Sequence, residues 1–130
     1  MYIEHIAIWT HQLEVLRDFY CKYFNAKSNS KYVNPAKKFT SYFLTFDSGA
    51  RLEIMQMEGI HRNPLIPNQN TGIVHFAMQM DSKDAIDRMT ENLRSEGITI
   101  FSEARTTGDG YYESVIQDPD GNLIELATKL

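Results

Sequence analysis

The sequence predicts an α+β fold in which two βαβββ modules pair into a cupped mixed sheet with helices on its outer face. Two strand-like segments that contain a histidine each lead into a helix-like segment, and each half of the chain then ends in a strand, a turn and a strand. Between the halves, His5 and His75 are 70 residues apart, and the pairs Gly49/Gly121 and Glu53/Glu125 are each 72 apart. This near-constant offset indicates an internal duplication.

The first predicted module spans residues 1–57. It begins with the strand "IEHIAIWT" at 3–10, and the following "HQLEVLRDFYCKYFNAK" has the apolar spacing of a helix, for which Thr10 is the expected cap. A weaker strand is expected over 27–33. The segment 41–57, "SYFLTFDSGARLEIMQM", is typical of a hairpin because two strand-like runs flank a turn with Asp and Gly.

A linker over 58–72, "EGIHRNPLIPNQNTG", separates this module from a second one at 73–130, and its Pro, Asn and Gly content favours a surface connection. The second module repeats the pattern. The strand "IVHFAMQM" precedes a helix that we expect Ser82 to cap and Gly97 to end. A weaker strand, "ITIFSE", and the hairpin "YESVIQDPDGNLIELAT" complete it. We expect the modules to form a single domain over residues 1–130.

Strand alternation sends one histidine and one carboxylate of each module away from its helix. His5 shares a face with Ala7, and the second module repeats this arrangement with His75. Glu53 and Glu125 each lie between two apolar residues of a hairpin strand. Each of the four, taken singly, is more often structural than functional, but matching residue types in two repeats are hard to explain by packing. Two imidazoles and two carboxylates suit one divalent transition metal, with nickel or zinc expected, and leave two octahedral positions open.

Composition excludes several other classes of function. A net charge of −4 and a pI near 5.5 disfavour nucleic acid binding, which needs a basic face. The chain has neither a signal-peptide-like start nor an apolar run of about 18 residues, so we expect no membrane partner. The single Cys21 has no cysteine with which to form an intramolecular disulfide, which fits a reducing cytoplasm.

Four segments resemble the vicinal oxygen chelate superfamily, which includes glyoxalases, bleomycin resistance proteins and dioxygenases. They are "EHIAIWT", "ARLEIM", "IVHFAM" and "DPDGNLIEL". The ligand order His, Glu, His, Glu is similar to that of bacterial glyoxalase I, whereas the dioxygenases and fosfomycin-modifying transferases typically use two histidines and one glutamate. The resemblance therefore implies a metal-dependent lyase or isomerase of the lactoylglutathione lyase type. The alternatives are another metalloenzyme of the superfamily, such as a thiol transferase or dioxygenase, or a protein that binds a drug or metabolite.

Further roles follow from the resemblance. The substrate would be a small oxygenated compound or a thiol hemithioacetal, converted through an enediolate that the metal stabilises. Glu125 would be the first-choice base, with Glu53 as its counterpart on the other side of the substrate. The resemblance also implies a homodimer in which His5 and Glu53 of one chain meet His75 and Glu125 of the other, although the linker leaves pairing within one chain open.

The sequence departs from classical glyoxalase I where glutathione would be held. Trp9 stands in place of an arginine, and Met57 in place of an asparagine. Arg51 shares the strand face of Glu53 and is either a replacement anion anchor or an exposed hairpin residue. Tyr111 and Tyr112 belong to the Gly-containing segment 105–114, which is either a loop over the cup or a plain hairpin turn with packed tyrosines.

Overall fold

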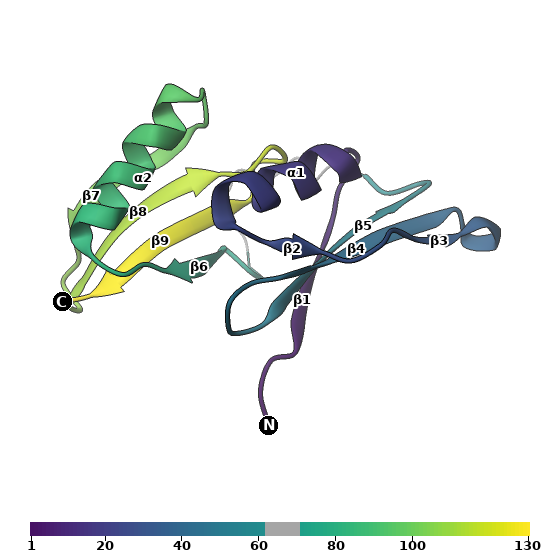
Figure 1. Cartoon of the computed structure of the whole chain (residues 1–130), viewed down its shortest axis with the longest axis horizontal. Coiled ribbons are helices and arrows are strands. Elements are labelled where there is room, and N and C mark those ends of the chain that lie inside the picture. Colours follow the sequence, from purple (N-terminus) through teal and green to yellow (C-terminus); the bar gives the residue numbers. More distant parts are fainter. Residues whose placement is uncertain (62–70) are drawn as a thin grey trace. The chain divides into compact units, whose positions relative to one another are not determined.

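A computed structural model of the chain describes residues 1–61 and 71–130 and confirms the predicted α+β class with two βαβββ modules (Figure 1). The chain divides into two compact units, Met1–Asn63 and Pro64–Leu130. Residues 62–70 of the predicted 58–72 linker lie outside the described residues. No helix of the described part is long and apolar enough to cross a membrane.

The first module contains one long helix and a mixed sheet. Its elements are β1 (His5–Trp9), α1 (Leu13–Phe24), β2 (Lys27–Ser28), β3 (Tyr32–Asn34), the 3₁₀ turn η1 (Pro35–Lys37), β4 (Phe39–Thr45) and β5 (Arg51–Met57). The sheet order is β1-β5-β4-β2, with β3 also paired to β4. β1 runs parallel to β5, and the other pairs are antiparallel.

The weak strand expected over 27–33 is divided into β2 and β3, which pair with different parts of β4. Asn29 lies between them and replaces part of the ladder with its side chain. Its Oδ1 accepts a hydrogen bond from the Phe43 amide at 2.8 Å, while its own amide donates to the Phe43 carbonyl at 3.1 Å. A side chain that competes for backbone donors interrupts a strand locally.

The second module repeats this plan with an undivided middle strand. Its elements are β6 (His75–Gln79), α2 (Lys83–Ser95), β7 (Ile100–Thr106), β8 (Tyr111–Gln117) and β9 (Leu123–Lys129), and its sheet order is β6-β9-β8-β7. β6 is parallel to β9 as β1 is to β5. The turn glycines Gly49 and Gly121 have φ values of 83° and 85°, a conformation that other residues rarely adopt, which explains their recurrence in both hairpins.

Each module buries one face of its sheet under its own helix. The fully buried side chains of the first module include Leu16, Tyr20, Leu44 and Ile54, and those of the second include Ile86, Leu93, Ile116, Ile124 and Leu126. These residues occupy alternate positions on the central strands and helical spacing on α1 and α2. The opposite face of each sheet is therefore the one that remains for a functional site.

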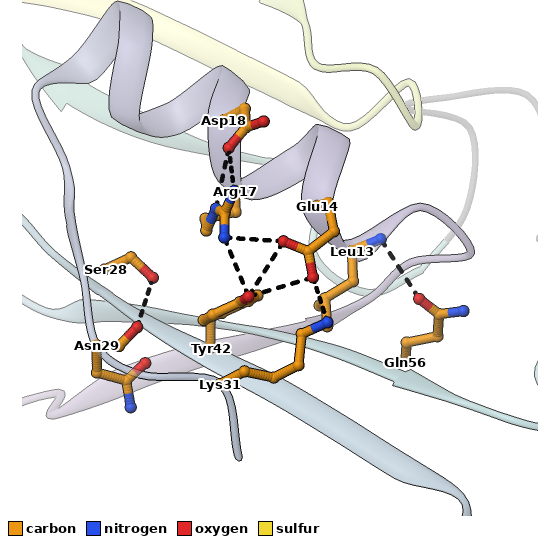
Figure 2. A network of polar contacts seen from close by, with 9 residues as sticks. All are labelled: Leu13, Glu14, Arg17, Asp18, Ser28, Asn29, Lys31, Tyr42 and Gln56. Carbon is orange, nitrogen blue, oxygen red and sulfur yellow. Dashed lines mark hydrogen bonds and ion pairs between the residues drawn. The ribbon is translucent and has the colours of Figure 1, made fainter. Parts of the chain in front are cut away.

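Polar contacts fasten α1 to its sheet beside this core (Figure 2). The Tyr42 hydroxyl donates to the Glu14 carboxylate at 3.1 Å and accepts from Arg17 at 3.0 Å, and Lys31 forms an ion pair with Glu14. Hydrogen bonds from Lys31 and then from Tyr42 lower the pKa of Glu14. Glu14 therefore remains ionised at neutral pH and links the helix to β4.

The predicted start of α2 is confirmed, whereas that of α1 is wrong. Ser82 caps α2 by accepting a hydrogen bond from the Ala85 amide at 3.2 Å, and Gly97 follows the end of the helix. At α1, however, Gln12 is the cap residue and makes no side-chain capping bond to the helix. Thr10 lies too far from the first turn, and its hydroxyl instead accepts from the Gln12 amide at 3.0 Å.

Candidate metal centre

The first module brings His5 and Glu53 together on the face of the sheet opposite α1. The parallel register of β1 and β5 sets Ala7 beside Glu53, and strand alternation puts His5 on the same face as Ala7. The His5 Nε2 atom lies 3.8 Å from the Glu53 Oε2 atom. The side chain of Ala7 is a single methyl group, so it adds little bulk next to the Glu53 carboxylate.

The second module makes the equivalent pair from His75 and Glu125. Ala77 lies beside Glu125 in the parallel register of β6 and β9, and the His75 Nε2 atom is 3.4 Å from the Glu125 Oε2 atom. The exposed fractions also match, with the histidine side chains at 40% and 41% and both carboxylates at 16%. Each carboxylate is thus half-buried in its sheet and has an imidazole nitrogen close to one of its oxygen atoms.

The four residues fit the chemistry of a divalent metal as two pairs of donors. Ligand atoms about 2.1 Å from a metal and at a right angle to each other lie about 3 Å apart, which the two pairs approach. In residues 1–61 and 71–130, no three His, Cys, Asp or Glu side chains cluster as a ready metal site. The described geometry is thus one His/Glu pair in each module.

A second carboxylate, which the sequence analysis did not single out, holds His5. Glu4 accepts a hydrogen bond from the Nδ1 atom of His5 at 2.5 Å and another from the Nε atom of Arg51 at 2.7 Å. The bond with His5, followed by that with Arg51, lowers the pKa of Glu4. Such a carboxylate fixes the proton on Nδ1 and leaves Nε2 free to bind a metal. The adjacency of Glu4 and His5 was the available sequence signal.

The second module adds a different carboxylate beside its ligand pair. In the β8–β9 register Val115 is opposite Glu125 and Glu113 is opposite Ala127, so Glu113 lies one diagonal step from Glu125 on the same face. Arg105 donates to Glu113 at 3.0 Å. Burial raises the pKa of Glu125, and the negative charge of Glu113 raises it further. Counting outward from the Gly121 turn would have placed Glu113 here from the sequence.

The residues predicted to contact substrate lie in different surroundings. Trp9 is on the Glu53 face and 45% exposed, whereas the Arg51 guanidinium is bound by Glu4 and stacked on Phe43 with its Cζ atom 4.1 Å from the ring centroid. Tyr111 is on the Glu125 face by strand alternation. The Tyr112 hydroxyl donates to Asp87 of α2 at 2.7 Å, on the opposite face of the sheet.

Comparison with known proteins agrees with this architecture. The profile of the Glyoxalase/Bleomycin resistance protein/Dioxygenase superfamily matches residues 2–126. The uncharacterized protein YqjT of Bacillus subtilis (strain 168) is 27% identical over 127 residues, covering 95% of this chain and 96% of that protein. A glyoxylase/bleomycin resistance protein/dioxygenase domain from Frankia sp. EAN1pec shares the fold, with a TM-score of 0.83 at 12% identity over 100% of this chain and 98% of that chain.

An enzyme structure is also similar to this chain. Glyoxalase I from Zea mays has a TM-score of 0.79 at 26% identity, with 98% of this chain and 44% of that chain covered. The chain therefore spans less than half the length of the maize enzyme.

Proposed function

We propose that this chain, which belongs to the Glyoxalase/Bleomycin resistance protein/Dioxygenase superfamily, is a metal-dependent lyase or isomerase of the glyoxalase I type. Its substrate would be a thiol hemithioacetal or another small oxygenated compound. The superfamily name also covers proteins that confer resistance by binding. The observation that favours an enzyme is the matched pair of ligand sets, since each module keeps one imidazole beside one half-buried carboxylate.

In this proposal His5, Glu53, His75 and Glu125 hold one divalent metal, with nickel or zinc expected from the donor types. When bound, the metal would supply Lewis-acid stabilisation of negative charge that develops on the substrate oxygen atoms. The protein supplies the orientation of the donors. Glu4 keeps the Nδ1 proton of His5 in place, and Arg51 in turn holds Glu4.

Glu125 is the proposed base that removes a proton from the carbon next to the substrate carbonyl. In the metal-free protein, burial and then the charge of Glu113 raise the pKa of this carboxylate. Its proposed role as the base rests on its place at the proposed metal, where it would be held within reach of the substrate carbon. Glu53 occupies the corresponding place in the first module and is the proposed group that acts on the other side of the substrate. Glu125 can then return the proton that it removed to the adjacent carbon atom, so the proton balances without a second donor.

We propose a homodimer in which a first module of one chain and a second module of the other share each site. One module offers a single His/Glu pair, and two pairs are needed for four ligands. The two-fold axis of such a dimer repeats each site, so the dimer would contain two of them.

Metal analysis of untagged protein, followed by an assay with methylglyoxal and several thiols, tests the proposed function. We expect about one divalent metal ion per chain and isomerisation of at least one hemithioacetal, both lost after treatment with a chelator and restored by nickel or zinc. Untagged protein that neither contains nor takes up a divalent metal would contradict the proposal. Uptake of metal without turnover of any hemithioacetal would exclude the glyoxalase I type.

A further inference from the structure

The face of the first module that carries His5 and Glu53 continues into a group of apolar and aromatic side chains. We call this group the aromatic patch, and its members are Trp9, Tyr32, Phe39, Met55 and Met57. Trp9 is beside Met55 in the β1–β5 register, and Phe39 is beside Met57 in the β4–β5 register. Because side chains alternate along a strand, Met55 is the next residue after Glu53 on this face. The patch therefore begins one side-chain step from a proposed metal ligand.

The rings of the aromatic patch hold one another in place but stay open to solvent. The Trp9 and Phe39 centroids are 6.1 Å apart with the rings at 86°, and those of Tyr32 and Phe39 are 6.0 Å apart at 61°. These are edge-to-face arrangements, which stabilise aromatic pairs. Trp9 nevertheless remains 45% exposed and Tyr32 52% exposed. A contiguous exposed group of this kind on a soluble domain commonly marks a binding surface.

The charges around the patch favour an uncharged ligand group. Arg51 is bound by Glu4 and stacked on Phe43, and Lys38, the residue before β4, forms an ion pair with Glu58. A ligand carboxylate would have to displace one of these partners, at the cost of an unpaired acidic side chain. An apolar ring would gain contact area on Trp9 and Phe39 without such a cost.

We infer that the aromatic patch selects a substrate that carries an aromatic group beside its chelating oxygen atoms, as in the hemithioacetal of an aryl α-keto aldehyde. This inference rests on the proposed function, because it takes His5 and Glu53 as the metal ligands next to the patch. The two regions are continuous along the β1–β5 ladder, because Ala7 lies beside Glu53 and the next pair on this face is Trp9 beside Met55. A chelating head on the metal would thus leave its substituent over the patch.

Two hydroxamates that share one chelating head test this selection. Benzohydroxamate carries a phenyl group and acetohydroxamate a methyl group, and calorimetric titration of the metal-loaded protein gives both affinities. We expect benzohydroxamate to bind about tenfold more tightly, the effect of burying one ring against aromatic neighbours. Trp9 is the sole tryptophan, so its fluorescence should respond to benzohydroxamate far more than to acetohydroxamate.

A matched pair of variants separates the patch from general effects of substitution. Trp9→Gln introduces the residue that the second module carries at the equivalent position, Gln79, and should reduce the preference to about twofold or less. Phe101→Ser removes another exposed aromatic side chain, from β7, and should leave the preference unchanged. Equal affinities in the wild type, or a preference that survives Trp9→Gln, would overturn the inference.

Two further measurements complete the test. Weak acrylamide quenching of Trp9 in the ligand-free protein would overturn the inference, because it would show that another module or a second copy covers the patch. If the protein takes up no metal, the proposed function fails, and benzamide and acetamide repeat the comparison without a chelating head. A fluorescence response of the metal-free protein to benzamide alone then supports the patch, and equal responses to both amides overturn it.

Discussion

The two modules differ on the face beside their ligand pairs. Beyond Glu53 the first module carries Trp9, Met55, Phe39 and Met57. At the equivalent positions beyond Glu125 the second module carries Gln79, Ala127, Tyr111 and Lys129, and it replaces Ser41 with Glu113. Arg105 pairs with Glu113 there. After duplication, the pairs of His and Glu stayed alike while one neighbouring surface became apolar and the other charged.

In the proposed site, this difference would give the two modules separate tasks. The proposed metal would need the same donor types from both modules, which accounts for the matched positions. A substrate is asymmetric, and the surfaces that touch its two ends have no reason to match. We therefore expect the second module to control proton transfer and the first module to control which substituent is accepted.

The largest expected effect concerns the two carboxylates as bases. Glu125→Gln should lower turnover about 10³-fold, because an amide accepts protons poorly while its oxygen still offers a metal ligand. Metal content measured by mass spectrometry should fall much less than turnover. Glu53→Gln is the matched variant in the first module and should cost less turnover for a similar loss of metal. Equal losses of turnover in both variants would remove the proposed division between the modules.

Mixing two inactive variants tests whether the modules of different chains share a site. His5→Ala and His75→Ala chains, combined under conditions of subunit exchange, should regain about a quarter of wild-type activity, because half of the dimers are mixed and each contains one intact site. Each variant alone, treated identically, is the control. If both modules of one site belong to the same chain, every site keeps a lesion and mixing restores nothing.

The residue before each histidine gives a smaller contrast. Glu4→Ala should weaken nickel or zinc affinity about tenfold, because His5 loses the acceptor that fixes its Nδ1 proton. Val74 is the residue at the equivalent position in the second module, and Val74→Ala should leave metal affinity unchanged. Competition with a chromogenic chelator measures both affinities. A similar change in the two variants would show that the hydrogen bond of Glu4 does not matter for the metal.

Periodicity and the internal duplication predicted the helices and strands well, because both can be read from the spacing of residues along the chain. Strand alternation placed Glu53 opposite α1, and the helical stripe placed Leu16 and Ile86 in the cores. The cap of α1 was wrong because Thr10 has a typical capping side chain and Gln12 does not, and the path of the chain after β1 overrides that preference. The split of the weak strand into β2 and β3 depends on the hydrogen bonds of Asn29, which no periodicity reports.

Site neighbours were harder to predict than site residues. Glu4 binds Arg51, 47 residues away, through a register that the sequence alone leaves open. Glu113 was within reach, because the turn at Gly121 determines the partners of β8 and β9. Tyr111 and Tyr112 were both predicted to contact substrate, but adjacent strand residues point to opposite faces of a sheet. Only Tyr111 therefore lies on the face that carries Glu125.

The smallest effect is a pH dependence of stability that has opposite signs in the two modules. Glu14 has a lowered pKa in the folded metal-free protein, so its contribution is present above its unfolded pKa of about 4.5 and is lost as the pH falls below that value. Glu125 has a raised pKa, so its ionisation costs stability as the pH rises through its folded pKa. We therefore expect metal-free Glu14→Gln to be less stable than the wild type at pH 7, and Glu125→Gln to be more stable. Both differences should shrink toward pH 4 in urea unfolding followed by circular dichroism. A loss of stability in metal-free Glu125→Gln at pH 7 would show that this carboxylate is satisfied without a metal, and would remove the contrast with Glu14.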